Sequence, residues 1–187
     1  MYSVYENCPI LQNERYLLRL VAKDDCLDLL KVYSDKKSVY LFNSDNCNGD
    51  NFYYTSEERM KKQIDFWLTE YESGYYVRWS IIDKHSNEAI GTIELFNRQA
   101  NDFFNDCGLL RLDLRSDYET VSEIKSVLSL IVKPAFEMFD CIMLATKAIP
   151  KAKTRIAVLK EMGFKLSEKK LFGHNGTEYC DYYVLVK

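Results

Sequence analysis

The stretch from Leu109 to Phe139 constrains the fold more than any other part of the chain. It begins with the apolar run LLRLDL, passes through the polar segment RSDYET, and continues with apolar residues at helical spacing. This order predicts a core strand, a tight loop and an amphipathic helix. Such a helix N-terminus is a common place for a phosphate, because its free N–H groups and the helix dipole favour an anion.

Acidic residues occupy this helix start, namely Asp117, Glu119 and Glu123. A carboxylate about 5 Å from a phosphate charge costs on the order of 3 kcal/mol at an effective dielectric near 20. That penalty is roughly a hundredfold in affinity for each close pair. Ser116 with Glu119, and Thr120 with Glu123, also have capping-box spacing, which would engage the same N–H groups. Two interpretations remain open: an acidic turn that stabilises the helix, or a remodelled anion site.

The rest of the chain predicts strands and helices in mixed order. We expect strands at 16–21, 76–83, 89–97 and 141–146, helices after 25, at 55–71 and at 154–161, and a last strand pair at 164–171 and 179–186. A long polar loop is expected at 34–54, either as a substrate-side lid or as a mobile segment. The order is that of an α+β fold with a mixed, mostly antiparallel sheet, and 187 residues predict a single domain, 1–187.

Composition excludes several classes of function. A net charge of -3 gives no general attraction to nucleic acid, and the longest apolar runs, such as 128–132, are too short to span a membrane. The six cysteines are scattered without a C-x-x-C pair, so we expect free thiols and no metal site. The first residues have no secretory-signal pattern, and we therefore expect a cytoplasmic protein.

Three further segments carry a family resemblance. The hairpin with Gly91-Thr92-Ile93, the segment LKEMGF at 159–164, and Asp181-Tyr182-Tyr183 together resemble the GNAT superfamily of acetyltransferases, across about residues 15–186. The chain is most similar to the branch that acetylates protein N-termini, ribosomal proteins among them, and small amines. The resemblance implies a three-layer fold with helices on both faces of a twisted sheet. It also implies acetyl-CoA as co-substrate, and a small-molecule or peptide amine that attacks the thioester directly.

The family's pyrophosphate motif aligns onto the acidic loop. Asp117 stands at its Gln/Arg position, Thr120 and Ser122 stand at its two glycines, and Glu119 stands where a basic residue is usual. The resemblance implies cofactor contacts from one set of residues, namely Leu112, Leu114, Arg115, Glu119, Thr120, Val121, Ser122, Ala152 and Arg155. The basic residues at 151–155 are open to two interpretations, as a phosphate site or as a solvated helix start.

The resemblance also requires a general base and an acid. Glu94 and Asp113, on neighbouring strands, are the candidates for the base, with outward-facing, exposed strand residues as the alternative. Tyr179 or Tyr182 is the candidate acid, provided that the last hairpin folds toward the cleft. A second hypothesis from another class is a GNAT-fold protein that has lost CoA binding and acts as a non-catalytic binding or regulatory module. A homodimer is one option for the assembly, which the sequence leaves open.

Overall fold

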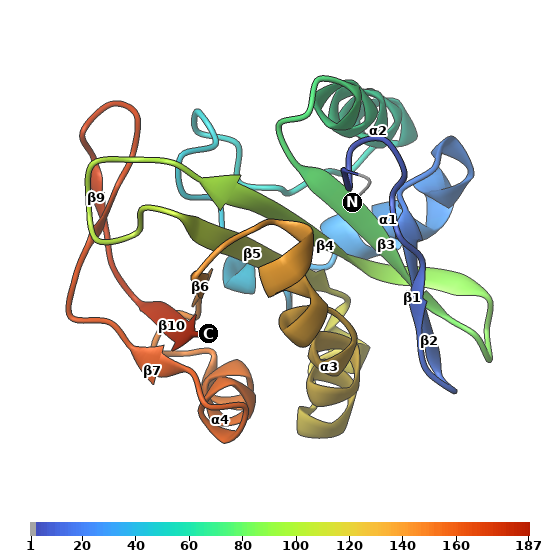
Figure 1. Cartoon of the computed structure of the whole chain (residues 1–187). Coiled ribbons are helices and arrows are strands. Elements are labelled where there is room, and N and C mark those ends of the chain that lie inside the picture. The colour runs from blue at the N-terminus through green and yellow to red at the C-terminus, as the bar shows by residue number, and fades with distance from the viewer. Residues whose placement is uncertain (1–2) are drawn as a thin grey trace.

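The computed structural model describes residues 3–187 and is built on an eight-stranded sheet (Figure 1). The strand order is β1-β2-β3-β4-β5-β6-β10-β7, and every neighbouring pair is antiparallel except β5 and β6, which are parallel. The strands of this sheet are β1 Leu11–Gln12, β2 Tyr16–Leu20, β3 Val77–Asp83, β4 Glu88–Arg98, β5 Cys107–Leu114, β6 Met143–Lys147, β7 Lys165–Leu166 and β10 Tyr182–Val186. The predicted α+β class with a mixed, mostly antiparallel sheet is confirmed.

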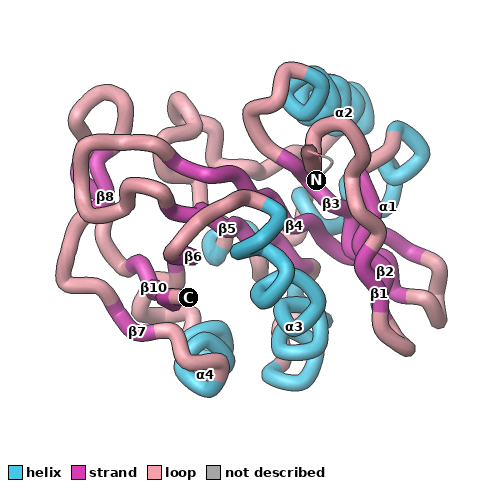
Figure 2. The backbone as a smooth tube through the Cα atoms, viewed as in Figure 1, coloured by secondary structure: helices cyan, strands magenta, loops and turns pink. Residues whose placement is uncertain are grey.

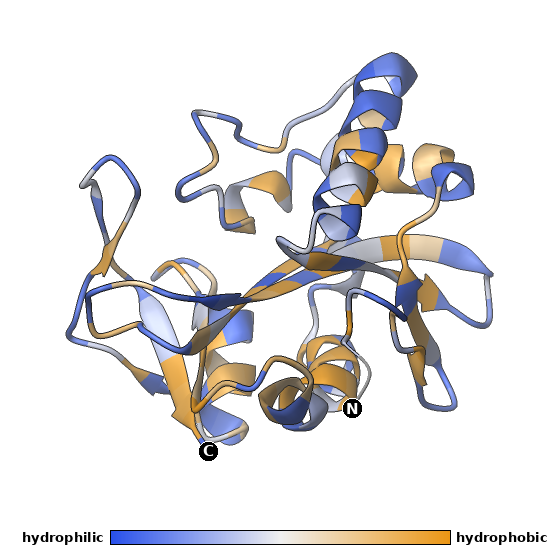
Figure 3. Ribbon diagram, turned by 45° about the horizontal axis from the view of Figure 1, so that its top comes forward, coloured by the Kyte–Doolittle hydropathy of each residue, from blue (hydrophilic) through white to orange (hydrophobic). Residues whose placement is uncertain are grey.

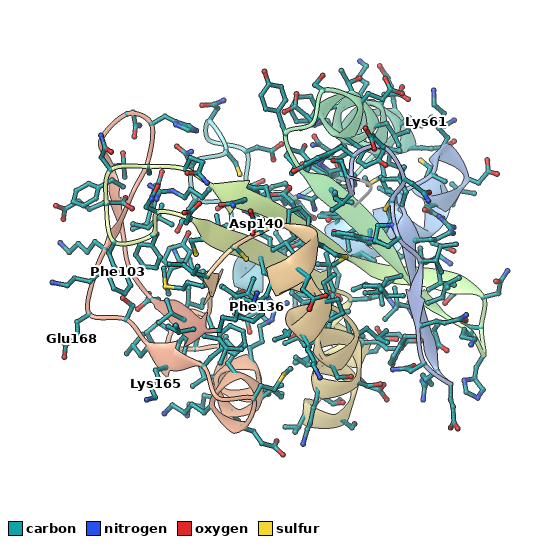
Figure 4. All side chains as sticks on the ribbon, in the orientation of Figure 1. Lys61, Phe103, Phe136, Asp140, Lys165 and Glu168 are labelled. Atoms are coloured by element: carbon teal, nitrogen blue, oxygen red, sulfur yellow. The ribbon has the colours of Figure 1, made fainter. Side chains whose placement is uncertain are left out.

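Helices cover both faces of the sheet, which gives three layers (Figure 3). The helices are α1 Cys26–Tyr33, α2 Glu57–Glu72, α3 Val121–Met138 and α4 Lys153–Glu161, with short 3-10 turns at Lys23–Asp25, Val39–Leu41 and Ser116–Tyr118. One core lies between the sheet and α3 and α4, and a second lies under α1 and α2. Figure 4 shows the side chains that these helices and strands carry. No helix within residues 3–187 is long and apolar enough to cross a membrane.

Local sequence signals set the helix ends. The Ser56 side chain accepts a hydrogen bond from the Arg59 N–H and caps α2. Gly74 follows the end of α2 with a φ of 76°, in the left-handed region that glycine adopts most easily. Thr120 caps α3 by accepting from the Glu123 N–H at 3.4 Å. The Glu123 carboxylate does not complete the capping box, because it accepts a hydrogen bond from the Tyr16 hydroxyl instead.

Two regions differ from the sequence prediction. The expected last strand pair is divided: β7 pairs with β10, whereas β8 Leu171–Phe172 and β9 Glu178–Tyr179 form a separate two-stranded sheet (Figure 2). The segment 34–54 contains a 3-10 turn and packs against the protein. Its aromatic residues Phe42, Phe52 and Tyr54 are buried around Tyr33. Burial of these rings stabilises a segment whose asparagines and glycine indicated only a loop.

Candidate functional site

A cavity of about 720 Å³ lies between α2 and the strands β3, β4 and β5. Its volume falls in the range typical of small-molecule sites. Five α2 residues at helical spacing line it, so one face of the helix forms one wall; they are Arg59, Gln63, Phe66, Trp67 and Glu70. The sheet contributes Arg78, Glu94 and Arg111.

The floor of this cavity is a buried network of charges. Glu94 pairs with Arg78 on β3 and with Arg111 on β5, the latter at 2.8 Å from Nη1 to Oε1. Arg78 also pairs with Asp113 at 3.1 Å, and the Tyr33 hydroxyl donates to the same carboxylate oxygen of Asp113 at 2.8 Å. Arg78, Glu94 and Asp113 are each at most 2% exposed. The network therefore compensates its charges internally.

Burial and ion pairing set the pKa values of the two carboxyl groups in opposite directions. Burial alone would raise the pKa of Glu94, but Arg111 and Arg78 outweigh it and lower that pKa. For Asp113 burial dominates and raises the pKa, although Arg78 opposes the shift. Glu94 is accordingly held as a carboxylate and is a weak base.

The predicted catalytic residues occupy three different environments. Glu94 lines the cavity, whereas Asp113 and Tyr179 are absent from its lining. The alternative of outward-facing, exposed strand residues is wrong for both acids, because both are buried. Tyr179 lies on β9, and its hydroxyl accepts a hydrogen bond from the Asn46 N–H at 3.0 Å. The sequence analysis did not identify Arg78 or Arg111 as site residues. The signal that could have identified them is the presence of these arginines, together with the acids Glu94 and Asp113, on adjacent strands of the predicted sheet.

A second region lies on the opposite face, where β5 and β6 separate. Their parallel pairing ends at Leu110 and Thr146, and the space beyond is lined by apolar side chains from β5, α3 and α4. Arg155 of α4 fills this space. Its Nη1 donates to the carbonyl oxygen of Leu112 at 2.7 Å and of Leu41 at 3.1 Å, and its Nε and Nη2 bind the Glu119 carboxylate.

The other residues of the predicted cofactor set lie around this pair. Leu112 and Leu114 are buried on β5, Ala152 is buried directly before α4, and Val121 is exposed in the first turn of α3. The Thr120 and Ser122 hydroxyl oxygens are 3.1 Å apart. Arg115 turns away and binds Asp117 at 2.8 Å and Glu88 at 3.3 Å. The structure thus brings together Leu112, Glu119 and Arg155, but not Arg115.

The space left between the diverging strands is too small for acetyl-CoA. The remaining cavity there is about 10 Å³, which is room for about one water molecule. The side chains of Arg155 and Glu119 are only 6% and 10% exposed, so the pair closes the gap. With Arg155 and Glu119 in this arrangement, the space between β5 and β6 does not fit acetyl-CoA. Among residues 3–187 no cluster of His, Cys, Asp and Glu could hold a metal ion.

The strand order, the parallel β5–β6 pair and the helices on both faces match the fold of solved GNAT-family acetyltransferase structures. Matching solved structures include a GNAT-family acetyltransferase from Bacillus anthracis, with 12% identity, a TM-score of 0.70 and coverage of 95% of this chain and 98% of that chain. A ribosomal-protein-S5-alanine acetyltransferase from Vibrio fischeri matches with 16% identity, a TM-score of 0.70 and 96% of both chains covered.

A third match is RimL, a ribosomal L7/L12 alpha-N-protein acetyltransferase in complex with coenzyme A. It has 18% identity and a TM-score of 0.67, with 95% of this chain and 98% of that chain covered. No family model and no curated protein matches the sequence. At these identities the shared property is the fold, which confirms the fold implied by the resemblance.

Proposed function

We propose that the chain, as one domain of residues 1–187, is an N-acetyltransferase that moves an acetyl group from acetyl-CoA to a primary amine. The acceptor is a small molecule or a protein N-terminus. The observation that carries the proposal is the 720 Å³ cavity beside β4 and β5, with a carboxylate in its floor, within a GNAT fold. A solved structure of the same fold in complex with coenzyme A supports the choice of cofactor.

Within the cavity we assign one role to Glu94. An acceptor ammonium must lose a proton before its nitrogen can act as a nucleophile. Glu94 is the predicted base that lines the cavity, and we propose that it accepts a hydrogen bond from the amine directly or through water. Its arginine partners lower its pKa, so Glu94 orients the amine through this hydrogen bond while the ammonium proton passes to solvent water.

The Arg155–Glu119 pair favours a second candidate, a GNAT-fold protein that no longer binds CoA and acts as a binding or regulatory module. Acetyl-CoA could enter the gap only if Arg155 left it. Breaking a buried ion pair costs on the order of 3–5 kcal/mol, which corresponds to roughly a hundredfold to several thousandfold in affinity. Native affinity for the cofactor should therefore be weak or absent.

Calorimetric titration with acetyl-CoA, followed by assay of CoA release with a panel of primary amines, tests the proposal. Saturable heat and amine-dependent release of CoA would support the transferase. Absence of both at millimolar cofactor, in the native chain and in a variant without the Arg155–Glu119 pair, would refute the transferase and leave the binding module.

A further inference from the structure

The cavity beside α2 contains one acidic side chain without a counter-charge. Apart from His174, the ionisable acids and arginines that line it are Asp50, Arg59, Glu70, Arg78, Glu94, Arg98 and Arg111. Within residues 3–187 all of these except Glu70 are ion-paired, as Arg59 with Asp50, Arg78 and Arg111 with Glu94, and Arg98 with Asp102. Arg78 also pairs with Asp113, so the ion-paired groups are balanced in charge once the partner acids Asp102 and Asp113 are counted. Glu70 is then the acid of the lining that has no ion pair within residues 3–187.

Aromatic residues line the same cavity as Glu70. Phe66 lies one helical turn before Glu70 on the same face of α2, and Tyr75 and Tyr76 follow the end of the helix. Phe66 is 51% exposed and Tyr75 is 65% exposed, which is unusual for large aromatic side chains grouped at one cavity. Aromatic faces attract cations through the ring quadrupole, and a nearby carboxylate adds a direct charge attraction.

We propose that this cavity binds an organic ammonium ion, with Glu70 as its counter-ion and the Phe66 ring beside it. Binding of the cation does not require any other part of the proposed function. One extension does rest on the proposed function. The amino group that attacks acetyl-CoA must be neutral, so a charged ammonium bound at Glu70 is not the attacking group and is a second amino group of the acceptor. The acceptor class is then a diamine.

The test adds the probe 1,4-diaminobutane to the full chain in the absence of acetyl-CoA. Binding is measured by calorimetry and by tryptophan fluorescence, to which Trp67 in the cavity lining contributes. Glu70→Gln should weaken binding about fivefold, the effect of about 1 kcal/mol for a partly exposed ion pair. Phe66→Leu keeps an apolar side chain but removes the ring, and should weaken binding about threefold. The neutral analogue 1-butanol should bind more weakly than the diamine to the native chain.

Glu72→Gln is the matched control, because Glu72 is an exposed residue on the same helix and does not line the cavity. It makes the same charge change and should leave binding of the diamine unchanged. Equal effects of Glu70→Gln and Glu72→Gln, equal binding of 1-butanol and the diamine, or no binding of the diamine would each overturn the inference. Diamine binding without acetyl-CoA binding, both in the native chain and in the variant without the Arg155–Glu119 pair, would refute the transferase alone. Turnover of simple monoamines that Glu70→Gln does not affect would refute the diamine extension alone.

Discussion

Removal of the Arg155–Glu119 pair should open the gap between β5 and β6. The perturbation is the double substitution Arg155→Ala/Glu119→Ala. Arg155 spans the gap through hydrogen bonds to two backbone carbonyls and to the Glu119 carboxylate. The double variant removes both charges, and so avoids the lone buried charge that either single alanine variant would leave at a cost of about 3–5 kcal/mol.

The expected gain in cofactor affinity follows from the same energies. The native chain must break the buried pair before acetyl-CoA enters, at a cost of at least about 3 kcal/mol. The double variant has no ion pair to break, and it also lacks the Glu119 carboxylate that would repel a phosphate. Acetyl-CoA should therefore bind the double variant on the order of a hundredfold more tightly than the native chain. Calorimetric titration measures both affinities, and circular dichroism checks that the variant is folded.

The matched control is Lys125→Ala/Glu161→Ala. This ion pair also joins α3 to α4, but its side chains are 49% and 52% exposed, so it does not fill the gap. Its removal should leave acetyl-CoA affinity within about twofold of the native value, because exposed pairs contribute little. Tight native binding that neither double variant alters would refute the argument that Arg155 closes the groove.

Two further predictions concern stability. Glu94→Gln should lower the free energy of unfolding by about 3–5 kcal/mol at neutral pH, because it leaves the buried Arg111 guanidinium without its counter-charge and leaves Arg78 paired with Asp113 alone. The pKa of Glu94 is lowered in the folded state, so its stabilisation is present above its ordinary pKa and is lost as pH falls through the folded value. Urea unfolding at neutral and acidic pH should show the difference between native and variant narrowing in acid, and a constant difference would contradict this. Gly91→Ala should lower the free energy of unfolding by about 3 kcal/mol, because its new Cβ would lie 2.2 Å from the Asp113 carbonyl oxygen. Gly176→Ala is the control: no atom lies within 4 Å of its new Cβ, and strain comes only from its φ of 79°. It should lower the free energy of unfolding by less in the same assay.

The sequence predicted elements whose signals are local. The helix expected at 55–71 and the amphipathic helix expected after the central strand each depend on residues within a few positions, and both are present, as α2 and α3. The divided C-terminal strands were not predictable, because β7, β8 and β9 have two residues each and show no measurable alternation. The position of Arg155 was not predictable either. Its partner Glu119 lies 36 residues earlier in the chain, and only the packing of α4 beside β5 brings them together.

The acids at the start of α3 now have a physical explanation that the sequence left open. Glu119 binds Arg155, Asp117 binds Arg115, and Glu123 accepts from Tyr16. Each carboxylate therefore has a donor within the protein, and two basic groups that could have bound a phosphate, Arg115 and Arg155, are already ion-paired. Loss of the family's glycines changes backbone freedom by only about 1 kcal/mol per residue, whereas each close carboxylate costs a bound phosphate about 3 kcal/mol. We therefore expect these ion pairs, more than the residues that replace glycine, to limit the affinity of this chain for the cofactor.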